Sequence, residues 1–509
     1  MRITRHLPAA IAAALLLTSC SGGTPPAAKA ESAIRHYGRI AFEPCSLASP
    51  LAANSIEARC ATFAVAENPA APGGRKIKLN LAWLPATEEG AASADPVFFL
   101  AGGPGQAATE HAATVAATLR DARKHRHIVL VDQRGTGKLS PLACRDDAGK
   151  DLVPANSSNT SDTSAAAIAE FAGRCAQAIA GTADARYYTT TEAVGDLDTV
   201  RAALGVARIN LMGVSYGTRV AQQYAARHPQ HTRTLVLDGV APNPLVVGGE
   251  FARTFERALE LQSENCRKLP DCKVRFGTDL RAQLRNLKTR LAVAPVEVEY
   301  RDPDTGESKR DTLTADTVVG LTHIFSYMPQ MASLLPMVID EADRGRYAPL
   351  MALAKMMERN VEGQMTRGMQ WSVICTEDAD RYRADPADAG TVLGDDMGDA
   401  FFAACKAWPR GERPADFNRP LQSNVPALLL SGEIDPVTPP AYGDAVLKGL
   451  PNGRHLVLRG QGHNVSGIGC LPKLLGQFIE SADAKTLDAG CLAPIGYVPP
   501  FTSFNGWEP

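Results

Sequence analysis

The sequence lacks an excess of either charge. It has 53 lysines and arginines against 55 aspartates and glutamates, for a formal charge of −2 at pH 7. Nucleic-acid binding needs a basic excess, so this balance excludes a protein built to hold a polyanion, and it implies no acidic membrane surface as a partner. The 45% hydrophobic residues are ordinary for a globular protein. The 509 residues suit one large domain with an insertion, or two domains.

The usual metal-binding spacings are also missing. The chain has no CxxC and no HExxH pattern, and its ten histidines are scattered. Zinc sites in proteins commonly show such spacings. The sequence therefore predicts no metal site and no cofactor.

Long apolar runs are absent except near the N-terminus. The run Leu7–Leu17 follows Arg2 and Arg5 and ends at Leu17-Thr18-Ser19-Cys20. It is too short to span a bilayer stably and has the layout of an export signal. Its last four residues resemble a bacterial lipobox, which implies a signal peptide over residues 1–19 and lipidation of Cys20. The protein would then face the periplasm or the cell exterior, anchored to the membrane only by this lipid.

A plain signal peptide cut near Cys20 is the alternative, and it would give a soluble periplasmic or secreted protein. In either case residues 20–35, rich in glycine, proline and alanine, are expected to form a tether without a core of its own.

Ten cysteines follow Cys20, an even number in a chain with an export signal, and this favours disulfides. Connectivity does not follow from sequence, so pairing in chain order is a hypothesis of local loop closure. The hypothetical pairs are Cys45–Cys60, Cys144–Cys175, Cys266–Cys272, Cys375–Cys405 and Cys470–Cys491.

Short aliphatic and β-branched runs recur through the first half of the chain. They cover residues 77–84, 97–100, 128–131, 209–212 and 235–237. Stretches with helical spacing lie between them, at 193–204 and 218–227. Apolar strands that alternate with helices indicate an α/β fold with a mostly parallel sheet covered on both faces.

The alternation stops after Val240. Four stretches with helical spacing follow, at 250–262, 315–327, 331–344 and 348–359, and a hairpin is predicted over 296–312 with its turn at Asp302–Gly306. Strand signals return at 427–430 and 455–458. We therefore expect a mainly helical cap, residues 244–420, inserted into a core formed by residues 36–243 and 421–509.

A candidate nucleophile lies in Gly213-Val214-Ser215-Tyr216-Gly217. The motif follows a predicted strand and precedes a predicted helix, the context in which a G-x-S-x-G serine is held in a sharp turn. Side chains at the two glycine positions would collide with neighbouring backbone in so tight a turn. The pattern is short enough to arise by chance, and its place after a strand favours the catalytic interpretation of Ser215.

A serine hydroxyl needs a base and an acid, which follow the serine in the chain on this kind of scaffold. His463 lies in a loop directly after the strand at 455–458, whereas His455 begins that strand and is interpreted as a strand-edge residue. Asp435 lies far out on the loop after the strand at 427–430, with Pro436 restricting its backbone. Glu433, on the same loop, is the alternative acid.

A glycine-rich loop, Leu100–Gln106, follows another apolar strand. Such a loop can bring backbone N–H groups next to a carbonyl oxygen. The N–H groups of Gly103 and Tyr216 are the predicted oxyanion hole.

Taken together, these motifs resemble the α/β-hydrolase peptidases of the proline iminopeptidase and tripeptidyl aminopeptidase group. The resemblance rests on Gly102–Gly105, Asp132–Gly137, Gly213–Gly217, Gly432–Pro439 and Gly462-His463, and covers most of the mature chain. The length, the cap and the paired cysteines are similar to the exported, tripeptidyl-aminopeptidase-like branch. Ala101 departs from the histidine that many relatives have, which puts fine substrate preference in doubt.

The resemblance implies hydrolysis of peptides from a free N-terminus. Ser215 would attack the scissile carbonyl, His463 would transfer the proton, and Asp435 would stabilise the imidazolium. A carboxylate must then pair with the substrate ammonium, and Glu377 matches an acidic position of the relatives. Alternatively, Glu377 and Asp378 are ordinary acids of a first helical turn.

Asp132 and Arg134 are interpreted as structural, bracing their glycine-rich turn. Two other functions stay open: a carboxylic ester hydrolase with the same triad, and a non-catalytic binding lipoprotein. The sequence does not indicate an oligomeric state.

Overall fold

The computed structural model describes residues 34–49, 52–88, 90, 92–145, 149–152, 164–277, 279–361 and 365–503. The predicted signal peptide, Cys20 and nearly all of the predicted tether lie outside these residues. The first strand begins at Arg35, which is the last residue of the predicted tether. Among the described helices, none combines the length and the apolarity that a membrane crossing needs.

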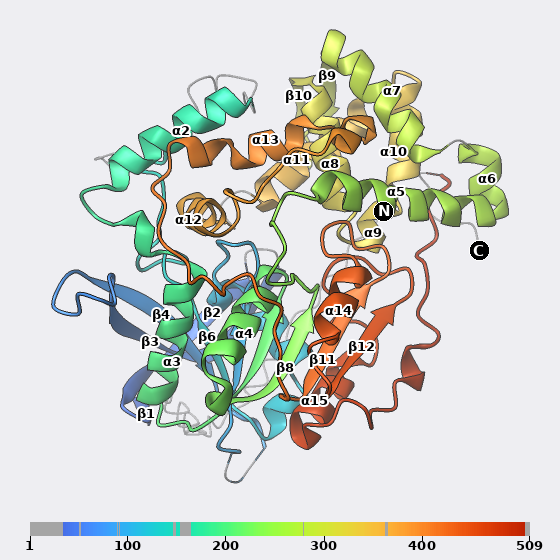
Figure 1. The fold of residues 1–509 in the computed structure, drawn as a ribbon. Coiled ribbons are helices and arrows are strands. Elements are labelled where there is room, and N and C mark those ends of the chain that lie inside the picture. Colours follow the sequence, from blue (N-terminus) through green and yellow to red (C-terminus); the bar gives the residue numbers. More distant parts are fainter. Residues whose placement is uncertain are drawn as a thin grey trace, which may run out of the picture.

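A ten-stranded sheet forms the centre of the molecule, in the order β1-β2-β3-β4-β6-β5-β7-β8-β11-β12 (Figure 1). Strands β1 to β4 pair antiparallel, and β4 pairs antiparallel with β6. The remaining six strands, β6, β5, β7, β8, β11 and β12 in this spatial order, are parallel to one another. The strands are β1 (Arg35–Tyr37), β2 (Ile40–Ser49), β3 (Ala52–Ala66), β4 (Lys76–Leu84), β5 (Val97–Leu100), β6 (Ile128–Val131), β7 (Ile209–Val214), β8 (Thr232–Asp238), β11 (Ala427–Gly432) and β12 (Gly453–Leu458).

Helices cover both faces of this sheet. On one face, side chains of α3 (Thr190–Ala203) and α4 (Tyr216–Arg227), such as Val200 and Val220, join a core with Phe98. On the other face, α1 (Ala112–Thr118) and α15 (Leu471–Ser481) pack through residues such as Val115. Strands buried on both faces are apolar throughout, as β5 and β6 are. The predicted α/β class with a mostly parallel sheet is thereby confirmed.

The α-helices vary from one turn to five in length. They are α1 (Ala112–Thr118), α2 (Ala165–Ile179), α3 (Thr190–Ala203), α4 (Tyr216–Arg227), α5 (Phe251–Lys268), α6 (Pro270–Phe276), α7 (Leu280–Val293), α8 (Ala315–Phe325), α9 (Pro329–Ala332), α10 (Leu335–Asp343), α11 (Ala348–Val361), α12 (Arg367–Glu377), α13 (Asp396–Ala403), α14 (Pro440–Leu447) and α15 (Leu471–Ser481).

A mainly helical segment, α5 to α13, lies between β8 and β11 in the chain and above the sheet in Figure 1. It carries the predicted hairpin, β9 (Val296–Arg301) with β10 (Ser308–Leu313), and a core of its own that includes Phe255, Leu284 and Ile339. We call this segment the cap. Its predicted limits at residues 244 and 420 stay a prediction.

One expected helix differs from the structure. Residues 331–344 form α9 and α10 with a break at Ser333 and Leu334. Pro336 stands in the first turn of α10. A proline has no N–H and clashes with the preceding turn, so it fits the start of a helix and not its interior.

All five hypothetical cysteine pairs are disulfides in the structure, with Cα–Cα distances from 4.8 to 6.3 Å. They join β2 to β3, the loop after β6 to α2, α5 to α6, α12 to the segment after α13, and the start of α15 to the C-terminal segment. Such density is typical of proteins that fold in an oxidising, exported setting.

Candidate active site

Ser215 stands in a sharp turn between β7 and α4. Its φ of 56° and ψ of −124° lie in a region that non-glycine residues rarely adopt. The main-chain N–H of Ser215 donates to the carbonyl oxygen of Asp238 at 2.8 Å, and Thr218 donates to the Ser215 carbonyl from its N–H at 2.9 Å. The serine is partly exposed, whereas its neighbour Tyr216 is buried.

The two flanking glycines are required by close backbone approach. A Cβ on Gly213 would overlap the main chain of Gly217, and a Cβ on Gly217 would overlap the carbonyl of Leu100. The steric reason given by the sequence pattern therefore holds in the fold.

Asp435 and His463 meet on neighbouring loops after β11 and β12. The Nδ1 atom of His463 lies 2.7 Å from Oδ2 of Asp435. The other carboxylate oxygen accepts the N–H groups of Val437 and Thr438 at 2.9 and 2.8 Å, and the Thr438 hydroxyl donates to Oδ2. Asp435 is 2% exposed and His463 8%. The pair is thus fixed and nearly closed to solvent.

Each member of this pair stabilises the charged form of the other, so the two pKa values shift in opposite directions. Burial lowers the pKa of the His463 imidazole, but the Asp435 carboxylate outweighs burial and leaves that pKa above its ordinary 6.5. Burial raises the pKa of the Asp435 carboxyl, and His463 together with two backbone amides brings it below its ordinary value. The pair therefore favours an ionised aspartate beside a histidine ready to take a proton.

Asp238, at the end of β8, joins the serine turn to the histidine loop. Its carbonyl oxygen accepts from Ser215, and its carboxylate accepts the N–H groups of Val465 and Ser466 at 2.9 Å each. The next residue, Gly239, has a φ of 67°, and a Cβ there would come within 2.9 Å of the His463 ring. The serine turn and the imidazole therefore converge on the end of β8.

The sequence did not single out Asp238, because a polar residue at a strand end carries no local signal of such a role.

The glycine-rich loop lies against the serine. A Cβ on Gly102 would stand 3.1 Å from the Ser215 Cβ. Within the described part of the chain, the backbone N–H groups of Gly103 and Tyr216 donate to no protein acceptor. Gly103 also has a positive φ of 107°.

Cap residues contact the loops that carry the candidate site, and two of these contacts involve His463 and the glycine-rich loop. The carbonyl oxygen of Tyr327 accepts the main-chain N–H of His463 at 2.7 Å, and the two rings pack edge to face with centroids 5.2 Å apart. Thr366, just before α12, donates its N–H to the carbonyl of Gly105 at 2.9 Å. Neither residue was predicted, since both contacts join positions more than one hundred residues apart.

The two alternative residues have other partners. Glu433 accepts the N–H of Gly460 at 2.8 Å and so braces the loop before His463. His455 lies within β12 and pairs through its two ring nitrogens with Asp444 and Ser431. The interpretation of His455 as a strand residue agrees with this position.

Glu377 is the last residue of α12 and is 0% exposed. Its carboxylate accepts the N–H and the hydroxyl of Thr190 at 2.7 and 3.0 Å, and Arg219 lies 3.6 Å away. Burial raises the pKa of Glu377 to about 8, with Arg219 opposing the shift. Asp378 caps the same end of the helix, so neither acid stands in a first turn. An ammonium contact by Glu377 stays a prediction.

Asp132 and Arg134 are both buried and both brace the fold. The Asp132 carboxylate accepts hydrogen bonds from Thr109 and Asn80. Arg134 forms a bidentate salt bridge with Asp196, and both hydrogen bonds are 2.8 Å long. These contacts match the structural role expected for the two residues.

Comparison with known proteins adds to this geometry. The family described as "alpha/beta hydrolase fold" matches residues 95–268, and that described as "TAP-like protein" matches residues 390–491. "Serine protease Hip1" of Mycobacterium tuberculosis is 28% identical over 478 residues, covering 89% of this chain and 91% of that protein.

Two further relatives match over shorter stretches. "Tripeptidyl aminopeptidase" of Streptomyces lividans is 30% identical over 195 residues, 36% of each chain. "Carboxylesterase B" of Mycobacterium tuberculosis is 31% identical over 236 residues, 44% of each chain.

The sheet, the serine turn and the acid–base pair, with these matches, define a serine hydrolase of the α/β-hydrolase fold. The segment that includes Asp435 and His463, residues 390–491, is the one that matches the family described as "TAP-like protein".

Proposed function

We propose that the protein is a serine exopeptidase that removes residues from the free N-terminus of peptides. The observation that carries the proposal is the Asp435–His463 pair at 2.7 Å, beside the Ser215 turn and directly under the cap residue Tyr327. The Hip1 match, which runs over nearly the whole of both chains, supports peptide substrates. The shorter match to a tripeptidyl aminopeptidase supports attack from the N-terminus.

The reaction proceeds through an acyl-enzyme. The Ser215 hydroxyl attacks the scissile carbonyl carbon, and His463 takes the hydroxyl proton and passes it to the leaving amine. A water molecule then attacks the ester carbonyl, with His463 again as the base. Asp435 stays ionised and stabilises the imidazolium formed in each half of the reaction.

The N–H groups of Gly103 and Tyr216 form the oxyanion hole. Two observations support this assignment: both groups lack a protein acceptor among the described residues, and the loop of Gly103 packs against Ser215. Donors held in place before the reaction stabilise the developing negative charge without reorganisation.

Recognition of a free N-terminus requires a carboxylate near the end of the site. Glu377 is the residue that the family resemblance assigns to this role. In the present arrangement a substrate ammonium would have to replace the hydrogen bonds from Thr190, so the assignment needs its own test, described below.

Paired peptide amides test the proposal directly. One substrate has a free N-terminus and its twin is acetylated there, with products identified by mass spectrometry. We expect efficient release of N-terminal residues from the first, a loss of at least about a hundredfold on acetylation, and no turnover by Ser215→Ala. Equal cleavage of both twins, or internal cleavage products, would contradict an exopeptidase.

The carboxylesterase B match favours one second candidate, an ester hydrolase with the same triad. This enzyme would hydrolyse simple acyl esters faster than peptide amides and would be indifferent to acetylation. The same paired substrates, with a matched acyl ester as a third arm, separate the two functions. A fluorophosphonate that labels wild type but not Ser215→Ala excludes the non-catalytic alternative.

We also propose that Cys20 carries a lipid that anchors the exported protein. The support is the resemblance of Leu17–Cys20 to a lipobox and the five disulfides of an exported chain. Labelling with a radioactive fatty acid should mark wild type and not Cys20→Ala, which should leave the membrane fraction. Unlabelled wild type in the soluble fraction would favour the plain signal peptide.

A further inference from the structure

Two histidines and an aspartate come together at the far end of α4 from the catalytic serine. Helix α4 begins directly after Ser215, and its 12 residues end at Arg227. At the rise of an α-helix this length separates Ser215 from His228 by about 18 Å. The second histidine, His231, ends the short 3₁₀ helix Pro229–His231, and Asp198 projects from α3. The cluster is therefore separate from the active site.

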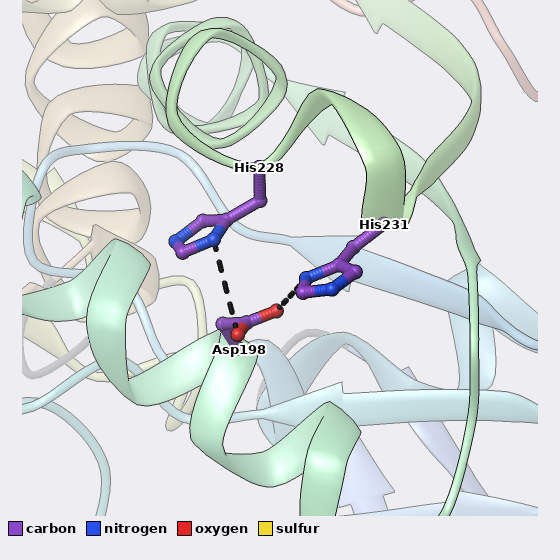
Figure 2. Close-up of side chains that lie close together, drawn as sticks. All are labelled: Asp198, His228 and His231. Atoms are coloured by element: carbon purple, nitrogen blue, oxygen red, sulfur yellow. Dashed lines mark hydrogen bonds and ion pairs between the residues drawn. The ribbon is translucent and has the colours of Figure 1, made fainter.

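The three side chains face one another, as Figure 2 shows. The Nδ1 atom of His231 lies 2.7 Å from Oδ1 of Asp198, and the Nδ1 atom of His228 lies 3.8 Å from Oδ2. The two rings are stacked, with centroids 5.8 Å apart and planes 9° from parallel. Each residue offers one ligand atom, and these atoms all lie within 4.8 Å of one another.

These separations are close to those of a metal site. Ligands that surround a tetrahedral zinc ion at about 2.1 Å lie roughly 3.4 Å apart from each other. The two measured contacts, 2.7 and 3.8 Å, lie on either side of that value, so small side-chain rotations suffice to admit an ion. Two imidazole nitrogens and one carboxylate oxygen form a donor set that suits zinc and similar divalent transition metals.

Neighbouring groups hold the carboxylate in place. Arg201 Nε and the Tyr224 hydroxyl donate to Oδ1 of Asp198 at 2.7 and 2.9 Å. Contacts of this kind orient ligands in metalloproteins. Arg201 Nη2 also donates to Oδ2, which faces His228, but at 3.3 Å, so Oδ2 is the less engaged oxygen. Arg201 also neutralises part of the carboxylate charge, so the site should hold its ion less tightly than a buried structural zinc centre.

Solvent reaches the cluster. The side chains of His228, His231 and Asp198 are 25%, 26% and 20% exposed to solvent. An ion can therefore reach them, and water can serve as a further ligand. The spacing His228-Pro229-Gln230-His231 is visible in the sequence, but it falls on a turn, and the aspartate lies 30 residues earlier. The sequence alone therefore did not indicate this cluster.

We propose that Asp198, His228 and His231 bind one divalent transition-metal ion of the zinc class, which ties α3 to the C-terminal end of α4. An ion at this place stabilises the folded chain and takes no part in the chemistry at Ser215, about 18 Å away at the helix rise.

Zinc binding to the untagged, chelator-treated protein tests the proposal by equilibrium dialysis and metal analysis. We expect one zinc ion per chain in wild type. His228→Gln and His231→Gln keep a hydrogen-bonding side chain of similar size but remove a ligand, and each should weaken binding at least about tenfold. The matched control is His455→Gln. His455 pairs with Asp444 at 2.8 Å, and this pair has only one histidine, so the substitution should not change zinc binding at the cluster.

Thermal unfolding gives a second readout. Zinc should raise the melting temperature of wild type and of His455→Gln, and should not raise that of the two cluster variants. Labelling of Ser215 by a fluorophosphonate should proceed at the same rate with and without zinc. Wild type that binds no zinc at about 100 µM, or cluster variants that bind it as tightly as wild type, would overturn the proposal.

Discussion

Asp238 holds Ser215 through its main chain and holds the loop of His463 through its side chain. The 2.8 Å bond from the Ser215 N–H fixes the serine turn, while the carboxylate binds the two amides that follow the histidine loop. One buried residue thus connects the Ser215 turn to the His463 loop. We therefore expect Asp238 to act as a positioning residue.

Asp238→Asn tests that role. The amide keeps one acceptor oxygen and leaves a buried N–H of the loop unpaired, so the free energy of unfolding should fall by about 1–3 kcal/mol. The loop would also lose its set position, so kcat should fall at least about tenfold while KM stays within a factor of two. Kinetics at a temperature where the variant is fully folded provide the measurement. A stability loss with unchanged kcat would limit Asp238 to a structural role.

The acid–base pair predicts the pH dependence of the reaction. Only neutral His463 accepts a proton, and its pKa lies above 6.5, so kcat/KM should rise with pH through an apparent pKa above that value. Asp435→Asn removes the charge that favours imidazolium, so the ascending limb should move to lower pH. At the optimum, kcat should fall by about 10⁴. If the ascending limb of the pH–rate profile lies at the same pH in Asp435→Asn and in wild type, a group other than His463 controls it.

The same pair contributes to stability in a defined pH window. Because the folded pKa of His463 exceeds the unfolded one, its contribution is fully present below about pH 6.5 and is lost as pH rises through the folded pKa. As pH rises through the folded pKa of His463, activity should therefore rise while this part of the stability falls.

Tyr327 should influence catalysis through His463. Edge-to-face contacts between aromatic rings contribute about 0.5–1.5 kcal/mol, so Tyr327→Ala should lower kcat roughly three- to tenfold. Tyr327→Phe keeps the ring and the backbone contact and should retain activity. A large loss in the phenylalanine variant would instead assign a role to the hydroxyl, for example in substrate binding.

The glycines of the serine turn offer a matched pair of substitutions. Gly217→Ala forces a Cβ into the carbonyl of Leu100 and should destabilise the fold by about 3 kcal/mol or more. Gly195→Ala, in α3 with no atom within 4 Å of the new Cβ, should be neutral or slightly stabilising. Chemical denaturation of both variants measures the difference, and similar values for the two would contradict the steric account.

Glu377→Gln separates two roles. Above about pH 8, where Glu377 is ionised, its carboxylate braces α12 against Thr190. At such a pH the variant should lose about 1–3 kcal/mol of stability and keep its KM within about twofold. A rise in KM of tenfold or more, confined to substrates with a free N-terminus, would support the ammonium contact instead.

Ser215, Asp435 and His463 could be predicted because each lies on a loop just after an apolar strand, and strand ends in a parallel sheet gather at one edge. The even number of cysteines predicted disulfides, and the hypothesis of pairing in chain order agrees with all five. The strands β1 to β3 gave no comparable signal, because β2 and β3 alternate between buried and exposed positions and contain few apolar runs. Asp238, Tyr327 and Thr366 depend on contacts between distant segments, which no local pattern records.

Helix α12 is fastened to the core at both ends. Thr366 bonds to the glycine-rich loop, Glu377 bonds to Thr190 at the start of α3, and the Cys375–Cys405 disulfide ties the helix to the segment after α13. We therefore expect α12 to stay in place when substrate binds. If the proposed exopeptidase function is correct, substitutions meant to change the length of the released product should be placed elsewhere in the cap and should leave residues 366–377 unchanged.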